Sequence, residues 1–259
     1  MVATLKRNND GRLKGRGYGM RQRPAAINTS QPPSMVLLPA NGDVEAGSDM
    51  SFLRHTLVLY TPPFSAVKHH PPFDWHTTIR LLYSMGNRSP GDLVRRKYKT
   101  LDKDNSTMYI CNGGQRLSLD SILSGPDIPV GYWTMHLHGL SSESFATIVN
   151  MAPPAPLLRG FLDTLQVYVF VSNCPLDKSF ILPMHTDHGG GPLAWLGGEP
   201  GSCCELELSG LSLNSPVAYN VRLCRKGDSI HIPARHRHRV RSSGTRICIS
   251  YFTNAPDVS

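Results

Sequence analysis

The chain has 259 residues, of which 40% are hydrophobic, and this length suffices for one or two domains with their own core. Its 21 prolines and 23 glycines are typical of a globular protein rich in strands and turns. No run approaches the ~20 apolar residues of a membrane span, and no secretory signal is visible. We therefore expect an intracellular protein with no membrane partner.

The formal net charge of +8 favours a polyanionic partner such as nucleic acid. Much of the excess lies in residues 1–24, where one acid, Asp10, stands among several cations: Lys6, Arg7, Arg12, Lys14, Arg16, Arg21 and Arg23. Residues 1–50 are polar and lack periodicity, which predicts a disordered basic tail. Its cations could bind phosphate, direct the protein to the nucleus, or form a solvated tail without a specific role.

Six cysteines occur, none in a C-x-x-C pair, and Cys203 and Cys204 are adjacent. This spacing is poor for a closed zinc site and suits thiols in a reducing compartment.

Residues 51–259 are expected to form a single domain, with mixed helical support over 51–166. A short strand is predicted at 57–60 and a helix at 73–85, where apolar residues recur at helical spacing. Further helices are predicted from Pro90 onward and over 157–166. The basic residues between Arg95 and Lys99 could contact phosphate or form a solvated face.

Residues 167–259 contain short apolar runs bounded mostly by Gly, Pro, Asn or Ser, which is typical of an antiparallel sandwich or barrel. The runs lie at 167–173, 180–187, 203–210, 217–223, 227–233, 238–243 and 246–252. We expect an α+β protein in which these strands form a double-stranded β-helix, or jelly roll, with helices from the N-terminal half packed on it.

The first chemical motif is His185-Thr186-Asp187, followed by a glycine run. Residues two apart in a strand point to the same face, so His185 and Asp187 can both aim into the barrel. An imidazole and a carboxylate are two of the three ligands of a facial triad, which leaves metal positions open for an oxoacid and O₂.

The second motif begins with the Gly-Asp turn at 227–228, continues through a strand and Pro233, and reaches His238. We expect His238 to be the third metal ligand. His236 is the rival, but it falls two residues short in this pattern. His136 and His138 form another H-x-H pair, which we interpret as part of a structural strand.

Arg246 lies on the run after His238, and its planar guanidinium suits bidentate pairing with a carboxylate. We expect Arg246 and Ser250 to bind the cosubstrate. The alternative is that Arg246 pairs with a buried carboxylate of the protein.

The last 75 or so residues resemble the TET/JBP group of nucleic-acid-modifying dioxygenases, particularly its short, transposon-associated members. The resemblance rests on His185 and Asp187 with the following glycines and Trp195, on the element 237–240, and on the strand 244–252. It implies an Fe(II) enzyme that uses 2-oxoglutarate and O₂ to oxidise the methyl group of 5-methylcytosine or thymine in DNA.

A methyl group on a stacked base cannot reach the metal, so the resemblance also implies a flipped base. His188 and Trp195 are then the candidate substrate-binding residues, and the protein would be a nuclear monomer acting in DNA demethylation. Two alternatives stay open. One is a cupin-like or JmjC-like hydroxylase of a protein side chain or small molecule, although these usually bind the oxoacid with a lysine. The other is a catalytically inactive nucleic-acid-binding relative.

Overall fold

The computed structural model describes residues 34–38, 56–62, 73–86, 93–100, 108–124, 129–209 and 218–253. These residues all belong to one compact unit, Pro32–Ser259. Most of the predicted tail at 1–50 lies outside the described residues. Within it, Ser34–Leu38 forms strand β1, which pairs in parallel with β2, so the tail prediction is wrong for this short stretch.

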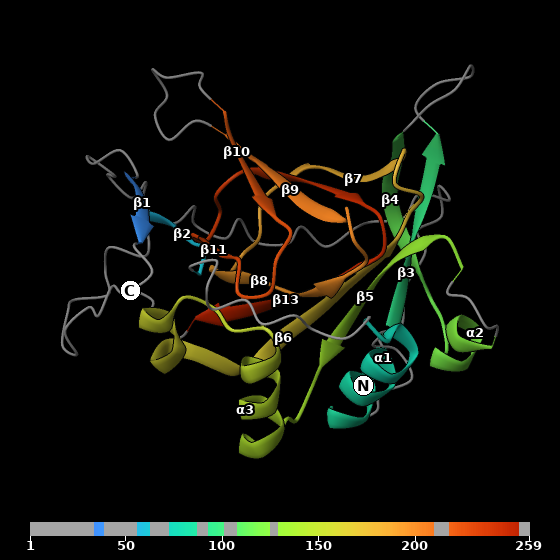
Figure 1. The fold of residues 1–259 in the computed structure, drawn as a ribbon, viewed down its shortest axis with the longest axis horizontal. Coiled ribbons are helices and arrows are strands. Elements are labelled where there is room, and N and C mark those ends of the chain that lie inside the picture. The colour runs from blue at the N-terminus through green and yellow to red at the C-terminus, as the bar shows by residue number, and fades with distance from the viewer. Residues whose placement is uncertain are drawn as a thin grey trace, which may run out of the picture. The chain divides into compact units, whose positions relative to one another are not determined.

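Eight consecutive strands form the core of the fold (Figure 1). They are β6 (Leu162–Asn173), β7 (Ser179–His185), β8 (Gly191–Gly198), β9 (Cys203–Leu208), β10 (Tyr219–Leu223), β11 (Ser229–Ile232), β12 (His238–Ser243) and β13 (Arg246–Thr253). Hydrogen bonding places them in the orders β11-β8-β13-β6 and β7-β12-β9-β10. The chain alternates between these two groups except at the β9–β10 pair, which is the winding of a jelly roll, and the predicted fold class is confirmed.

Three earlier strands connect the two groups into one 13-stranded sheet. Strand β5 (Gly131–Leu137) pairs with β6, and β3 (Leu93–Thr100) lies between β5 and β4 (Met108–Arg116). Strand β4 then runs parallel to β7. At one end of the sheet, β2 (Thr56–Tyr60) pairs with β11 and β1 pairs with β2, whereas β10 forms the other end.

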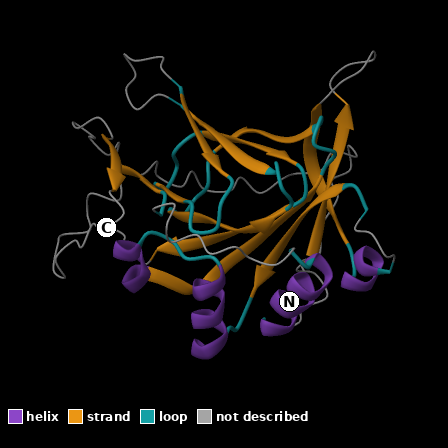
Figure 2. Cartoon of the chain, in the orientation of Figure 1, coloured by secondary structure: helices purple, strands orange, loops and turns teal. Residues whose placement is uncertain are grey.

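The helices gather on one side of the sheet, beside β5 and β6 (Figure 2). They are α1 (Trp75–Met85), α2 (Leu119–Leu123), α3 (Ser142–Met151) and the 3₁₀ helix η3 (Pro156–Phe161). The side chain of Asp74 caps α1 by accepting from the backbone N–H of Thr77. Helix α1 buries Ile79 and Leu82 against Met135 of β5. This packing confirms the predicted helix at 73–85 and the strand containing His136.

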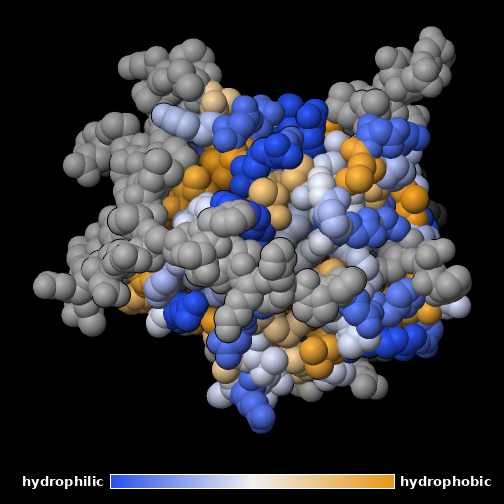
Figure 3. Space-filling model, viewed as in Figure 1, coloured by the Kyte–Doolittle hydropathy of each residue, from blue (hydrophilic) through white to orange (hydrophobic). Residues whose placement is uncertain are grey.

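The outer face of β9, β10 and β12 is polar, and a hydrophilic surface covers the β9–β10 region in Figure 3. Glu207 pairs with Arg239 at 3.0 Å, and Glu205 pairs with Arg222 at 3.2 Å. The alternate residues of these strands, such as Leu206, are buried in a hydrophobic cluster. This alternation of period two fixes which face of each strand points into the barrel.

Two expectations about local structure are wrong, and one strand was not expected. The region after Pro90 forms strand β3 rather than a helix, because β4 and β5 pair with it on both sides. In 157–166, only the short helix η3 forms before strand β6 begins at Leu162. Strand β8 was not predicted because glycines and Pro192 interrupt its pattern, yet it is paired with both β11 and β13.

Gly191 is required by a close approach between β8 and β13. A Cβ atom at this position would lie 1.8 Å from the backbone oxygen of Tyr251. We expect Gly191→Ala to lower the free energy of unfolding by about 1–3 kcal/mol, since the backbone must shift to relieve the clash. Chemical denaturation measures this. The matched control is Gly160→Ala, where an added Cβ meets nothing within 4 Å and the change should stay within about 0.5 kcal/mol. Equal effects of the two substitutions would contradict the prediction.

Candidate metal centre

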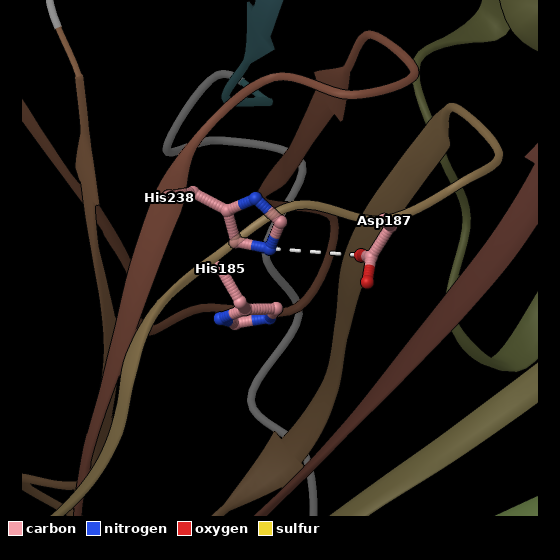
Figure 4. Close-up of side chains that lie close together, drawn as sticks. All are labelled: His185, Asp187 and His238. Atoms are coloured by element: carbon pink, nitrogen blue, oxygen red, sulfur yellow. Dashed lines mark ion pairs between the residues drawn. The ribbon is translucent and has the colours of Figure 1, made fainter. Parts of the chain in front are cut away.

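The structure brings His185, Asp187 and His238 together at one point of the barrel (Figure 4). His185 ends β7, and His238 begins β12 directly opposite it in the antiparallel register. One ligand atom from each of the three side chains lies within 4.8 Å of the other two. The Nε2 atom of His238 is 3.6 Å from Oδ2 of Asp187. Residues 51 positions apart therefore meet because β7 and β12 are neighbours in the sheet.

Backbone carbonyls orient both imidazoles. The Nδ1 atom of His185 is 2.7 Å from the carbonyl oxygen of Pro183, and Nδ1 of His238 is 3.0 Å from that of His236. A carbonyl only accepts hydrogen bonds, so each Nδ1 must donate its proton. Each Nε2 then keeps its lone pair for a metal, as is usual for histidine ligands.

Burial also favours the neutral form of His238. Its side chain is almost enclosed, which lowers the pKa of the imidazole, and the nearby His185 lowers it further. The backbone bond to His236 and the charge of Asp187 act in the opposite direction. The net lowering favours the unprotonated ring that metal binding requires.

The segment between β11 and β12 holds Asp187 in place. The backbone N–H of Arg235 donates to the backbone oxygen of Asp187 at 2.8 Å. Arg235 has a φ angle of 61°, and it is the only non-glycine residue with positive φ among those that the structure describes. A long side chain rarely adopts this conformation, and such residues cluster at functional sites.

Two imidazoles and one carboxylate fit a divalent transition metal. His185 ends β7, Asp187 follows it by two residues and His238 begins β12, so the three donors would hold one ion in the cavity wall. Two histidines and one carboxylate are the donor set of a facial triad, which would leave other positions of the metal open. The residues therefore fit the Fe(II) that the sequence predicted.

The triad lies in the wall of a cavity of about 700 Å³ inside the barrel. Arg246 and Ser250, the candidate cosubstrate-binding residues, line the same cavity, as does His188. Apolar residues such as Leu206 and Val240 complete its wall. The cavity is large enough for a small oxoacid together with part of a second molecule.

Arg246 is a buried charge without a matching carboxylate. It is 1% exposed, and its Nη2 donates to Oγ of Ser242. The guanidinium carbon lies 5.8 Å from the ring centroid of Tyr132. Burial raises the pKa of Tyr132 well above its usual value, so the neutral phenol does not balance the charge.

The Nε and Nη1 atoms of Arg246 have no hydrogen-bond partner among the described residues. No ion pair joins Arg246 to a carboxylate in this part of the chain, which counts against the alternative that it serves as a structural ion pair. An unpaired buried cation costs several kcal/mol. An anion bound in the cavity next to Arg246 would therefore stabilise this buried charge.

Two large aromatic residues of the C-terminal strands, Trp195 and Tyr251, are buried. Trp195 is 3% exposed and packs in a hydrophobic cluster with Leu57 and Cys248, outside the cavity lining. The predicted substrate contact Trp195 is thus placed in the core and not in the cavity wall. Tyr251 is fully buried, and its hydroxyl donates to the backbone oxygen of Ala152 at 2.8 Å. Both side chains therefore belong to the hydrophobic core.

Three other histidines of the described residues, at positions 136, 138 and 236, are not part of the triad. His236 does not share the metal-binding cluster found among the described residues, and its Nε2 is buried without a hydrogen-bond partner. His136 stacks on Tyr168 at 4.1 Å, and its ring is 3.6 Å from that of His138. Tyr168 lines the cavity, so this stack supports one of its walls.

The motif analysis missed the cavity residues that come from the N-terminal half. Tyr132 and Thr134 on β5 and Cys111 on β4 line the cavity, and so does Arg96 on β3. Arg96 belongs to the basic stretch noted in the sequence, but no spacing pattern distinguished it from its neighbours. Only the pairing of β3 with β4 and β5 places it there.

No family model matches the chain, and no curated protein sequence matches it. Among solved structures, the ribosomal oxygenase YcfD from Escherichia coli is similar, with a TM-score of 0.42, 16% identity, and coverage of 74% of this chain and 46% of that chain. The YcfD complex with cobalt and 2-oxoglutarate gives a TM-score of 0.42 at 15% identity, with the same two coverages. The complex with cobalt and succinic acid gives 0.41 at 15%, again covering 74% of this chain and 46% of that one.

This chain thus spans about half the length of YcfD. At these sequence identities and TM-scores, the similarity concerns the fold and carries no argument about activity or substrate. The comparisons give no support to the narrower TET/JBP resemblance.

Proposed function

We propose that this protein is an Fe(II)- and 2-oxoglutarate-dependent oxygenase. The observation that carries the proposal is the pairing of two features in one cavity. The cluster of His185, Asp187 and His238 suits a metal with open positions, and Arg246 is a buried cation that lacks an anion. 2-Oxoglutarate has a chelating oxoacid end and a distal carboxylate, so it matches both features at once.

Each group of the chain then has a defined task. His185, Asp187 and His238 hold the metal, and the carbonyls of Pro183 and His236 keep the two rings in the correct tautomer. Bound Fe(II) supplies the redox chemistry that couples decarboxylation of 2-oxoglutarate to oxidation of a C–H bond. Arg246 and Ser250 orient the cosubstrate, while the apolar wall excludes water from the reacting atoms.

Turnover of the cosubstrate tests this proposal directly. We expect the purified chain to convert 2-oxoglutarate to succinate in the presence of Fe(II), ascorbate and O₂, and to lose this conversion when a chelator removes the metal. Succinate can be measured by mass spectrometry. A folded protein that forms no succinate with any substrate pool would instead be the inactive binding relative.

The substrate class has two candidates. Hydroxylation of a protein side chain or small molecule is the broader one. Oxidation of a methylated DNA base is the second, favoured by the cations of residues 1–24 and by an arginine at position 246. The described lining of the cavity contains no lysine that could take the place of Arg246.

One experiment separates these candidates. The loaded enzyme is incubated with methylated duplex DNA, and the nucleosides are analysed by mass spectrometry for oxidised 5-methylcytosine or thymine. A parallel incubation with a cellular peptide and metabolite extract is analysed for additions of one oxygen atom. Products in the first arm support the DNA candidate, and products confined to the second support the broader class.

A further inference from the structure

A second arginine faces the same cavity, and the proposed metal and cosubstrate give it no partner. Arg96 lies on β3 and lines the cavity beside Cys111. Its Nε atom is buried and lacks a hydrogen-bond partner. No ion pair joins it to an acidic side chain among the residues that the structure describes. This half-buried cation therefore has one buried nitrogen that a ligand in the cavity could satisfy.

The strand itself separates Arg96 from its neighbour. Arg95 pairs with Gln115 and Arg96 with Gly114, so the two side chains leave opposite faces of β3. Arg95 donates from Nη2 to the backbone oxygen of Val130 at 3.0 Å and does not line the cavity. Arg95 therefore carries the same charge on the same strand as Arg96, but its side chain does not face the cavity.

Near Arg96, strand β4 leaves room for a ligand at Gly113. This glycine lines the cavity, and an added Cβ there would meet nothing within 4 Å. Nearby, burial raises the pKa of the Cys111 thiol to about 12, although the charge of Arg96 lowers it. The thiol is therefore protonated at neutral pH and does not neutralise Arg96.

The formal charges in the cavity show why a further anion is needed. Asp187 is the only acidic residue in the described lining, and Arg96 and Arg246 are its only arginines. A divalent metal, Asp187 and Arg246 together balance the dianion 2-oxoglutarate. Arg96 is then left as a surplus positive charge. In a cavity partly shielded from water, such a charge is stabilised by a ligand that carries the opposite one.

We propose that Arg96 is a specificity-determining residue that binds an oxyanion, either carboxylate or phosphate, of the molecule that is oxidised. The inference rests on the proposed function, because the charge balance assumes the metal and 2-oxoglutarate. If the inference holds, the substrate carries an acidic group close to the carbon atom that is oxidised. A cationic side chain in the same position would face Arg96 and be repelled.

The experiment uses the full chain loaded with Mn(II), a redox-stable substitute for Fe(II), and saturating 2-oxoglutarate. Methyl phosphate and acetate serve as probes, since both carry methyl protons whose relaxation is enhanced when they bind near Mn(II). Arg96→Gln removes the charge, and Arg95→Gln is the matched control. Circular dichroism and melting temperature confirm that both variants are folded.

We expect at least one probe to bind the wild type and Arg95→Gln alike, in addition to 2-oxoglutarate. Arg96→Gln should raise the dissociation constant of that probe about tenfold or more, with 2-oxoglutarate binding unchanged. Preference for methyl phosphate indicates a phosphorylated substrate, and preference for acetate indicates a carboxylic acid.

Three results would overturn the inference. The first is probe affinity that is the same in Arg96→Gln and the wild type. The second is loss of 2-oxoglutarate affinity in Arg96→Gln, which would make Arg96 part of the cosubstrate site. The third is a lack of any probe binding beside bound 2-oxoglutarate. Failure of the wild type to bind 2-oxoglutarate at all would instead overturn the proposed function, so the two failures are distinguishable.

Discussion

Replacing His185, Asp187 or His238 by alanine is expected to abolish formation of succinate while the fold survives. Each substitution removes one of three donors that lie within 4.8 Å of one another. Loss of a residue that merely supports a metal ligand typically costs 10–100-fold, so loss of a ligand itself should cost more than about 100-fold in metal affinity or activity. Metal content and succinate yield measure the two effects separately.

His236→Ala is the matched control for the distal ligand. His236 lies two residues before His238, but it stands outside the metal-binding cluster of the described residues. Its backbone oxygen, which holds the ring of His238, survives the substitution. We expect His236→Ala to retain metal and most activity. Activity that persists in His238→Ala and disappears in His236→Ala would assign the third ligand to His236.

Substitution of Arg246 is expected to weaken 2-oxoglutarate binding selectively. Arg246 is 1% exposed, and two of its nitrogens lack partners, so a carboxylate placed there would form a charge-assisted, desolvated pair. Removing one partner of such a pair costs about 3–5 kcal/mol, which corresponds to at least two decades in affinity. Arg246→Ala should therefore be nearly inactive at ordinary cosubstrate concentrations.

Arg246→Lys keeps the charge but loses the planar fork. We expect it to raise the apparent constant for 2-oxoglutarate sharply while Fe(II) binding stays close to that of the wild type. Arg239→Ala is the control, since Arg239 forms only an exposed pair with Glu207 and should affect neither. Titrations with 2-oxoglutarate and melting temperatures are compared for all three variants.

A purely structural role for Arg246 gives a different pattern. Both Arg246 variants would then melt at lower temperature, with no preferential loss of 2-oxoglutarate affinity. Wild-type dependence on 2-oxoglutarate in a folded Arg246→Ala protein would also remove the observation that favours DNA bases over other substrates.

The sequence by itself determined the jelly roll and the metal-binding cluster. Strands that bury one face alternate apolar and polar residues, so most core strands were recognisable from local pattern. The H-x-D spacing places His185 and Asp187 on one side of the chain, and the Gly-Asp turn with Pro233 locates His238 at the start of the next strand. These features depend on residues close together in the sequence, so they can be predicted from local spacing alone.

The tertiary structure decided what depends on pairing between distant segments. Strand β8 contains glycines and a proline that break its local pattern, and β3 follows a proline that suggested a helix. Both are strands because neighbours on each side satisfy their backbone hydrogen bonds. For the same reason, Trp195 is directed into the core and Arg96 into the cavity. Which face a side chain occupies is set by the register of its strand, and register depends on partners that the local sequence does not contain.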